Sequence, residues 1–109
     1  MRIWDIPPDK LCRNHLLGEH SEIHAIWSIL TNGKTGFAHH PETLRWRGKL
    51  KALYLRHEKI VWEMKKRGFN HYSTLDARFV TGKNIQDQFV DSYEEQIIIL
   101  KNKKCGCKV

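Results

Sequence analysis

The 109-residue sequence contains no apolar run that approaches the roughly 20 residues needed to span a bilayer. Its first residues, MRIWDIPPDK, also lack the apolar core of about 7–15 residues that marks a secretory signal peptide. A glycine-rich phosphate loop, a dinucleotide-binding fingerprint and a serine or cysteine nucleophile motif are missing as well. These absences argue against membrane contact and against several large enzyme classes, and we expect a cytoplasmic protein.

Cysteine is scarce, and the three that are present form an odd number, which argues against a closed disulfide framework. Cys12 falls in the first expected helix, whereas Cys105 and Cys107 lie in the tail KNKKCGCKV. Together with a histidine such as His15 they could hold zinc, but ordinary reduced thiols explain them more simply. We therefore expect no metal and no cofactor, with a small zinc protein as the alternative.

Acidic residues are few in relation to basic ones. Nineteen Lys and Arg stand against twelve Asp and Glu, which gives a formal net charge of +7 at pH 7. A surplus of this size on a small domain favours a polyanionic partner, most often a nucleic acid. The length suits one domain with a modest core, so we expect residues 1–109 to form a single domain.

Hydrophobic spacing predicts three helices over residues 9–31, 42–67 and 85–103, with irregular connections and no confident strand. Asp9 and Asn84 are the expected N-caps of the first and third helices. The fold class is therefore an all-α, single-domain bundle of about three helices. The second helix is expected to place Arg45, Lys49 and Arg56 away from its apolar face. The expected core positions of the second and third helices are Trp46, Leu50, Leu53, His57, Ile60, Val61 and Met64, and Ile85, Phe89, Tyr93, Ile97 and Leu100.

Residues 14–27, NHLLGEHSEIHAIW, place three histidines and two glutamates in fourteen positions of the first helix. His20 and His24 are four residues apart and share a face, but the zinc-protease pattern H-E-x-x-H requires a Glu where Ser21 stands. Glu22 lies roughly 200° around the helix from His20 and points away from the pair. The pattern favours a solvated histidine pair over a metal site.

A second stripe of the same helix contains His15, Glu19 and Glu22, because at about 100° per residue these three positions fall close together. An apolar stripe runs beside it, which places Glu22 next to a hydrophobic boundary. Glu22 is therefore a candidate catalytic carboxylate, and a surface glutamate in a helix pair is the alternative interpretation.

The α-amino group of Met1 is the candidate partner for such a carboxylate. Its reference pKa is about 7.7–8.0, against about 10.4 for lysine, so on the order of 10% of it is uncharged at neutral pH. An uncharged amine can attack an electrophilic carbon and form a Schiff base. The start MRIWDIPP contains bulky apolar residues and two prolines, and we expect its first residues to pack against the bundle.

In several segments, the chain resembles the phage endonuclease V type of pyrimidine-dimer DNA glycosylases, in particular their short bacterial branch. The family's first helix has a His-Leu pair, a Glu four residues after the His and a second Glu three residues further on, as in NHLLGEHSE. The run KLKALYLRHEKIVWEMKKRGFN matches from Lys49 to Asn70, and NGK matches at residues 32–34. The segments MRIWDIPP, LCRNHLLGEH and HHPETLRWRGKLKALYLRHE are typical of the branch, and the resemblance covers most of residues 1–76.

The resemblance implies an all-α DNA repair enzyme, acting as a nucleoid-associated monomer on double-stranded DNA with damaged or abasic sites. In the family an N-terminal amine attacks C1′ of the damaged nucleotide, and β-elimination from the Schiff base then nicks the strand. The catalytic pair maps onto Met1 and Glu22. The expected DNA-binding residues are Arg2, Asn14, His15 and Ser21.

The chain also departs from the phage enzymes. They carry arginines one residue before and three residues after the essential Glu, where this chain has Ser21 and Ala25. The aromatic C-terminal tail of the phage proteins is missing. These departures favour, as the alternative function, a non-catalytic nucleic-acid-binding protein that has retained the fold.

Overall fold

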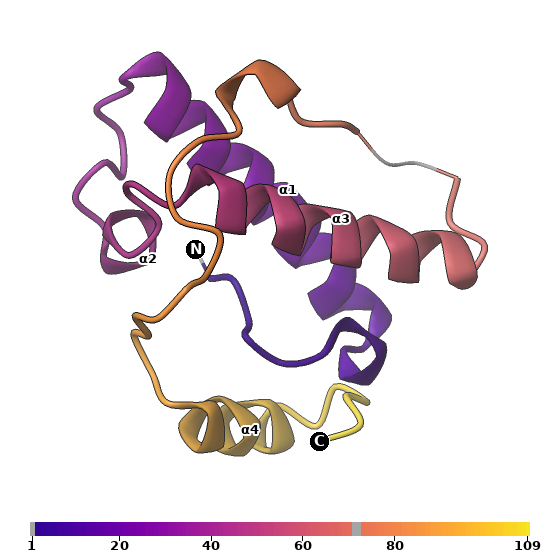
Figure 1. Ribbon diagram of the computed structural model, residues 1–109. Coiled ribbons are helices and arrows are strands. Elements are labelled where there is room, and N and C mark those ends of the chain that lie inside the picture. The colour runs from indigo at the N-terminus through magenta and orange to yellow at the C-terminus, as the bar shows by residue number, and fades with distance from the viewer. Residues whose placement is uncertain (1, 71–72) are drawn as a thin grey trace.

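The computed structural model describes residues 2–70 and 73–109 and has four α-helices there, with no strand in that part of the chain. They are α1 (Arg13–Asn32), α2 (Pro41–Leu44), α3 (Leu50–Lys66) and α4 (Tyr93–Asn102), with short 3-10 turns at Pro8–Lys10 and Ala77–Phe79. Figure 1 shows α1 and α3 crossing at the centre, with α4 on the other side of the N-terminal segment. The prediction of an all-α fold is confirmed. Among the described residues, no helix is both long and apolar enough to cross a bilayer.

The core lies where α1 packs on α3. Leu16, Ile23 and Ile26 of α1 are fully buried, and they belong to one cluster with Leu53 and Ile60 of α3. The first helix begins at Arg13 and not at Asp9, because Pro8 leads into a single 3-10 turn and the chain is extended at Leu11, which is buried.

The predicted helix over 42–67 is wrong in one respect: it is divided into α2 and α3 by a turn. Gly48 in this turn has φ +71°, a left-handed conformation that favours glycine. Residues 81–83 dock against the turn, and the amides of Lys51 and Ala52 donate to the carbonyls of Thr81 and Lys83 at 2.8 and 3.0 Å. These bonds satisfy N–H groups that the first turn of a helix leaves without intrahelical partners.

The third predicted helix is also wrong at its start. It begins at Tyr93, where Ser92 and Glu95 form a capping box, a stronger start signal than the predicted cap at Asn84. Ile85 and Phe89 therefore lie outside the helix and are 68% and 51% exposed, while Leu100 is buried as expected.

The N-terminal segment runs between the α1–α3 pair and α4 (Figure 1). Ile3, Trp4 and Ile6 are buried. The Trp4 amide donates to Glu19 Oε1 and the Asp5 amide to Gln96 Oε1, both at 2.8 Å. The prediction that the first residues pack against the bundle is confirmed for these residues.

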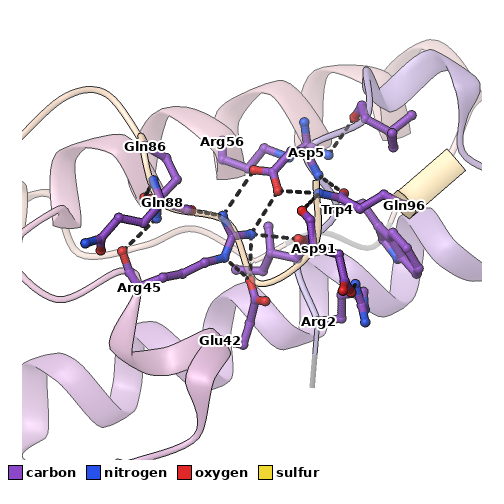
Figure 2. Close-up of polar contacts among 12 residues, drawn as sticks. Arg2, Trp4, Asp5, Glu42, Arg45, Arg56, Gln86, Gln88, Asp91 and Gln96 are labelled. Atoms are coloured by element: carbon purple, nitrogen blue, oxygen red, sulfur yellow. Dashed lines mark hydrogen bonds and ion pairs between the residues drawn. The ribbon is translucent and has the colours of Figure 1, made fainter. Parts of the chain in front are cut away.

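Arg45 is the centre of a buried polar network that holds this segment (Figure 2). Its side chain is 5% exposed and pairs with Glu42 at 2.7 Å and with Asp5 at 3.2 Å. It also donates to the carbonyls of Ile3 and Gln88 at 2.9 Å. The prediction that Arg45 and Lys49 lie away from the buried face is wrong, because the helix is interrupted at Gly48 and both residues are buried, each 5% exposed.

Candidate functional site

A pocket of about 290 Å³ lies between the N-terminal segment, α1 and the end of α4. Five of its lining residues come from α1, Arg2 and Trp4 come from the N-terminal segment, and Ile99 and Lys103 come from α4 and its C-cap. A larger hollow of about 680 Å³ runs along α3, but it contains none of the predicted site residues. The smaller pocket is lined by Arg2, Trp4, Asn14, His15, Gly18, Glu19, Glu22, Ile99 and Lys103.

The structure brings four of the predicted site residues together in this pocket: Arg2, Asn14, His15 and Glu22. Ser21 does not line it. Its exposed side chain belongs to another hollow, beside Arg13 and Phe69. Met1 lies outside the described residues, although Arg2, its neighbour in the sequence, lines the pocket.

The predicted stripe of His15, Glu19 and Glu22 is confirmed, but its two carboxylates have different surroundings. Glu19 is 2% exposed, and besides the Trp4 amide it accepts hydrogen bonds from Arg56 at 2.6 and 3.2 Å. Burial raises the pKa of the Glu19 carboxyl, while the Arg56 guanidinium acts in the opposite direction. Glu19 therefore anchors the N-terminal segment to α1 and α3.

Glu22 is half-buried at the pocket. Within the described part of the chain, no hydrogen bond or ion pair engages its carboxylate, in contrast to that of Glu19. A carboxylate held on a rigid helix and open to a pocket can stabilise developing positive charge or accept a proton.

Two basic residues, Arg2 and Lys103, line this pocket. The Arg2 guanidinium lies 4.8 Å from the centre of the Trp4 ring and pairs with Asp91 at 2.7 Å. Lys103, the C-cap of α4, is exposed and also lines the pocket. Sequence reasoning missed Lys103 because it lies 81 positions after Glu22, and no local pattern predicts that α4 returns to α1.

His15 also faces a cluster of thiols. Its Nδ1 lies 3.1 Å from Cys12 Sγ and 3.4 Å from Cys107 Sγ. Burial, and secondarily the charge of Lys103, lower the pKa of His15 and favour its neutral form. Burial, and then the hydrogen bond with Cys105, raise the pKa of the Cys107 thiol to about 12.

The prediction of a solvated histidine pair is wrong. His20 and His24 pack against His57 of α3, with ring centroids 4.7–5.1 Å apart. The Nε2 atoms of the three rings lie 2.9–3.4 Å from the Ser73 carbonyl oxygen. Helix periodicity predicts that His20 and His24 share one face of α1. The third ring, that of His57, joins them only because α3 packs on α1.

Gly18 lines the pocket between His15 and Glu22, and a Cβ built there meets no described atom within 4 Å. Gly18→Ala is therefore expected to raise the free energy of unfolding by about 0.5–1 kcal/mol, because glycine weakens a helix interior relative to alanine. Urea unfolding followed by circular dichroism measures the change. A lower stability in Gly18→Ala would contradict the open geometry at this position.

Comparison with known proteins connects this pocket to a family. Residues 1–77 match the family model of the pyrimidine dimer DNA glycosylases. The match includes all the pocket residues except Ile99 and Lys103. A search of curated proteins and a search of solved structures each gave no match. Because the matched residues make up well over half of the chain, the chain belongs to the pyrimidine dimer DNA glycosylase family.

Proposed function

We propose that this DNA glycosylase is bifunctional: it removes the damaged base, with pyrimidine dimers as the expected lesion, and then cleaves the strand at the abasic site. The α-amino group of Met1 is the nucleophile, and Glu22 is the catalytic carboxylate. One observation supports this most directly: the side chain next to Met1 in the sequence, Arg2, lines the same pocket as Glu22.

The first chemical step is attack of the uncharged amine on C1′ of the damaged nucleotide. The bond between C1′ and the base breaks, and the base departs with the electron pair of that bond and takes up a proton. Loss of a proton from nitrogen and opening of the sugar ring leave a Schiff base at C1′. Glu22 stabilises the positive charge that develops on the sugar and the imine.

The second step is β-elimination. Removal of a proton from C2′ sends an electron pair toward the imine, and the bond from C3′ to the phosphate oxygen breaks. Glu22 is the group that accepts this proton in our proposal. Hydrolysis of the imine then releases the amine and the nicked strand.

The proposed DNA contacts use the basic and polar rim of the pocket. Arg2, Asn14 and His15 contribute from the N-terminal segment and α1, and Ser21 remains a predicted contact from an adjacent hollow. Lys103 adds an exposed cation to this rim. Binding through such phosphate contacts is expected to weaken steeply as salt concentration rises.

Glu22→Gln is expected to lower the rate of strand nicking by about 10²–10⁴-fold, the usual contribution of a positioned acid–base group. The substrates are a duplex with one abasic site and an ultraviolet-irradiated duplex, and borohydride traps the covalent Schiff-base intermediate. Glu94→Gln is the matched control, because Glu94 is an exposed residue of α4 outside the pocket. Its nicking rate should equal that of the wild type.

A trapped adduct with an unchanged nicking rate in Glu22→Gln would overturn only the catalytic role of Glu22. Absence of a trapped adduct on both duplexes, together with an unchanged nicking rate in Glu22→Gln, would falsify the enzymatic proposal. The replacement of the family arginines by Ser21 and Ala25 favours one alternative in that case. A non-catalytic nucleic-acid-binding protein would bind undamaged duplex with strong salt dependence and leave the strand intact.

A further inference from the structure

The fold brings all three cysteines of the chain to one histidine. Cys12 is the N-cap of α1 and His15 lies in its first turn, whereas Cys105 and Cys107 follow α4. The three sulfur atoms and one ring nitrogen all lie within 4.8 Å of one another. Two pairs of residues that lie at least 90 positions apart in the sequence thus form one group of four potential metal ligands.

The geometry points to a structural zinc site formed by Cys12, His15, Cys105 and Cys107. With Zn–S bonds of about 2.3 Å and Zn–N bonds of about 2.0–2.1 Å, a tetrahedral ion holds two sulfurs about 3.8 Å apart and a sulfur–nitrogen pair about 3.6 Å apart. The Sγ atoms of Cys105 and Cys107 are 3.4 Å apart, and His15 Nδ1 lies 3.1 and 3.4 Å from Cys12 Sγ and Cys107 Sγ. Small adjustments would reach tetrahedral spacing.

The donor set selects zinc among the common metal ions. Three thiolates and one imidazole are typical of closed, four-coordinate structural zinc sites, which leave no open position for a substrate. Each cysteine thiol loses its proton to water when it binds the ion. Three thiolates and one Zn²⁺ give the site a net charge of −1.

The surroundings of the four ligands suit that negative charge. The Cys12 amide donates to Cys107 Sγ at 3.1 Å, and the N-terminus of α1 favours negative charge at this position. The tail KNKKCGCKV also has four lysines in nine residues. These features favour thiolates and act against the burial that raises the pKa of the Cys107 thiol.

The proposed zinc would join the end of the chain to the start of α1. One backbone hydrogen bond already joins the last residues to the 3-10 turn that precedes α1, from the Lys108 amide to the Lys10 carbonyl at 2.7 Å. Lys103 and Ile99, which lie just before Cys105, line the pocket that also contains His15. The ion would therefore fix the side of the pocket formed by α4, whether or not the pocket performs the proposed reaction.

The test begins with untagged wild-type protein that is produced in zinc-supplemented medium and purified under reducing conditions. Elemental analysis should find close to one zinc per chain. Cys107→Ser should lose this zinc, whereas His24→Asn, which alters the separate histidine cluster, should retain it. Zinc at 1,000 times its dissociation constant should also multiply the folding equilibrium constant of the apo protein by about 1,000.

Cobalt provides a second measurement that does not depend on any variant folding. Co²⁺ added to reduced, zinc-free wild-type protein should give near-ultraviolet thiolate-to-cobalt charge-transfer absorption and intense visible bands of tetrahedral cobalt. Zinc should then abolish both signals. Reduced wild-type protein without zinc and without cobalt–thiolate absorption would overturn the proposal. Zinc that is lost in His24→Asn and kept in Cys107→Ser would also overturn it, because the ion would then belong to the histidine cluster.

Discussion

A short flexible extension placed ahead of Met1 is expected to abolish the borohydride-trapped adduct on abasic duplex DNA. Each added residue can displace the terminal amine by up to about 3.3–3.6 Å, and the nitrogen of Met1 becomes an amide that cannot form a Schiff base. The expected loss is complete, because the proposed reaction has no other nucleophile. The measurement is the yield of protein–DNA adduct after reduction, with the extended and the native protein at equal concentration.

The matched control is the same extended protein after a protease has removed the extension directly before Met1. This protein should recover the full adduct yield, which shows that the extension did not damage the fold. Lys103→Gln tests the side-chain amine of Lys103, which lines the pocket, and should leave the adduct yield within a few-fold of the wild type. An adduct that persists in the extended protein and disappears in Lys103→Gln would assign the nucleophile to Lys103 and overturn the role of Met1.

Arg45→Met is expected to lower the free energy of unfolding by about 3–5 kcal/mol, the usual result of breaking a buried ion pair from one side. The substitution leaves the Glu42 carboxylate, which is 3% exposed, without its cation. It also removes the donors to the carbonyls of Ile3 and Gln88. Since a small domain has only about 5–15 kcal/mol in total, Arg45→Met should be close to unfolding at 37 °C.

The measurement is urea unfolding followed by both circular dichroism and tryptophan fluorescence, because Trp4 and Trp46 are buried near this network. Arg47→Met is the matched control. Arg47 is exposed, and its hydrogen bond to the Ala38 carbonyl is long, at 3.5 Å, so the expected change is within about 0.5 kcal/mol. Equal stability of the two variants would show that the Arg45 network does not hold the N-terminal segment in place.

The periodic features of the site could be predicted from the sequence. Five of the residues that line the pocket come from α1, and spacings of three and four residues determine which side chains of a helix lie together. His15 and Glu22 were therefore identified as neighbours without coordinates, and Leu53, Ile60 and Met64 as core residues. The resemblance carried by NHLLGEHSE and KRGFN indicated the family that the comparison confirmed.

The features that depend on long-range packing could not be predicted in this way. Arg45 and Lys49 were expected to lie away from the apolar face of one continuous helix, but the helix is interrupted at Gly48 and both residues are buried. The three-histidine cluster needs His57 from α3, and Lys103 reaches the pocket only because α4 returns to α1. None of these contacts leaves a periodic signal, because each depends on how two separate elements are placed.

The helical class, the family and the face of α1 on which Glu22 lies all follow from local spacing and local motifs in the sequence. Which charged residues are buried, and which line the pocket, depends on how the helices pack together. The tertiary structure alone brought Cys105 and Cys107 to Cys12 and His15. The physical reason is that burial and ligand geometry depend on distances between elements, and hydrophobic packing of α1, α3 and α4 sets these distances after the helices are specified.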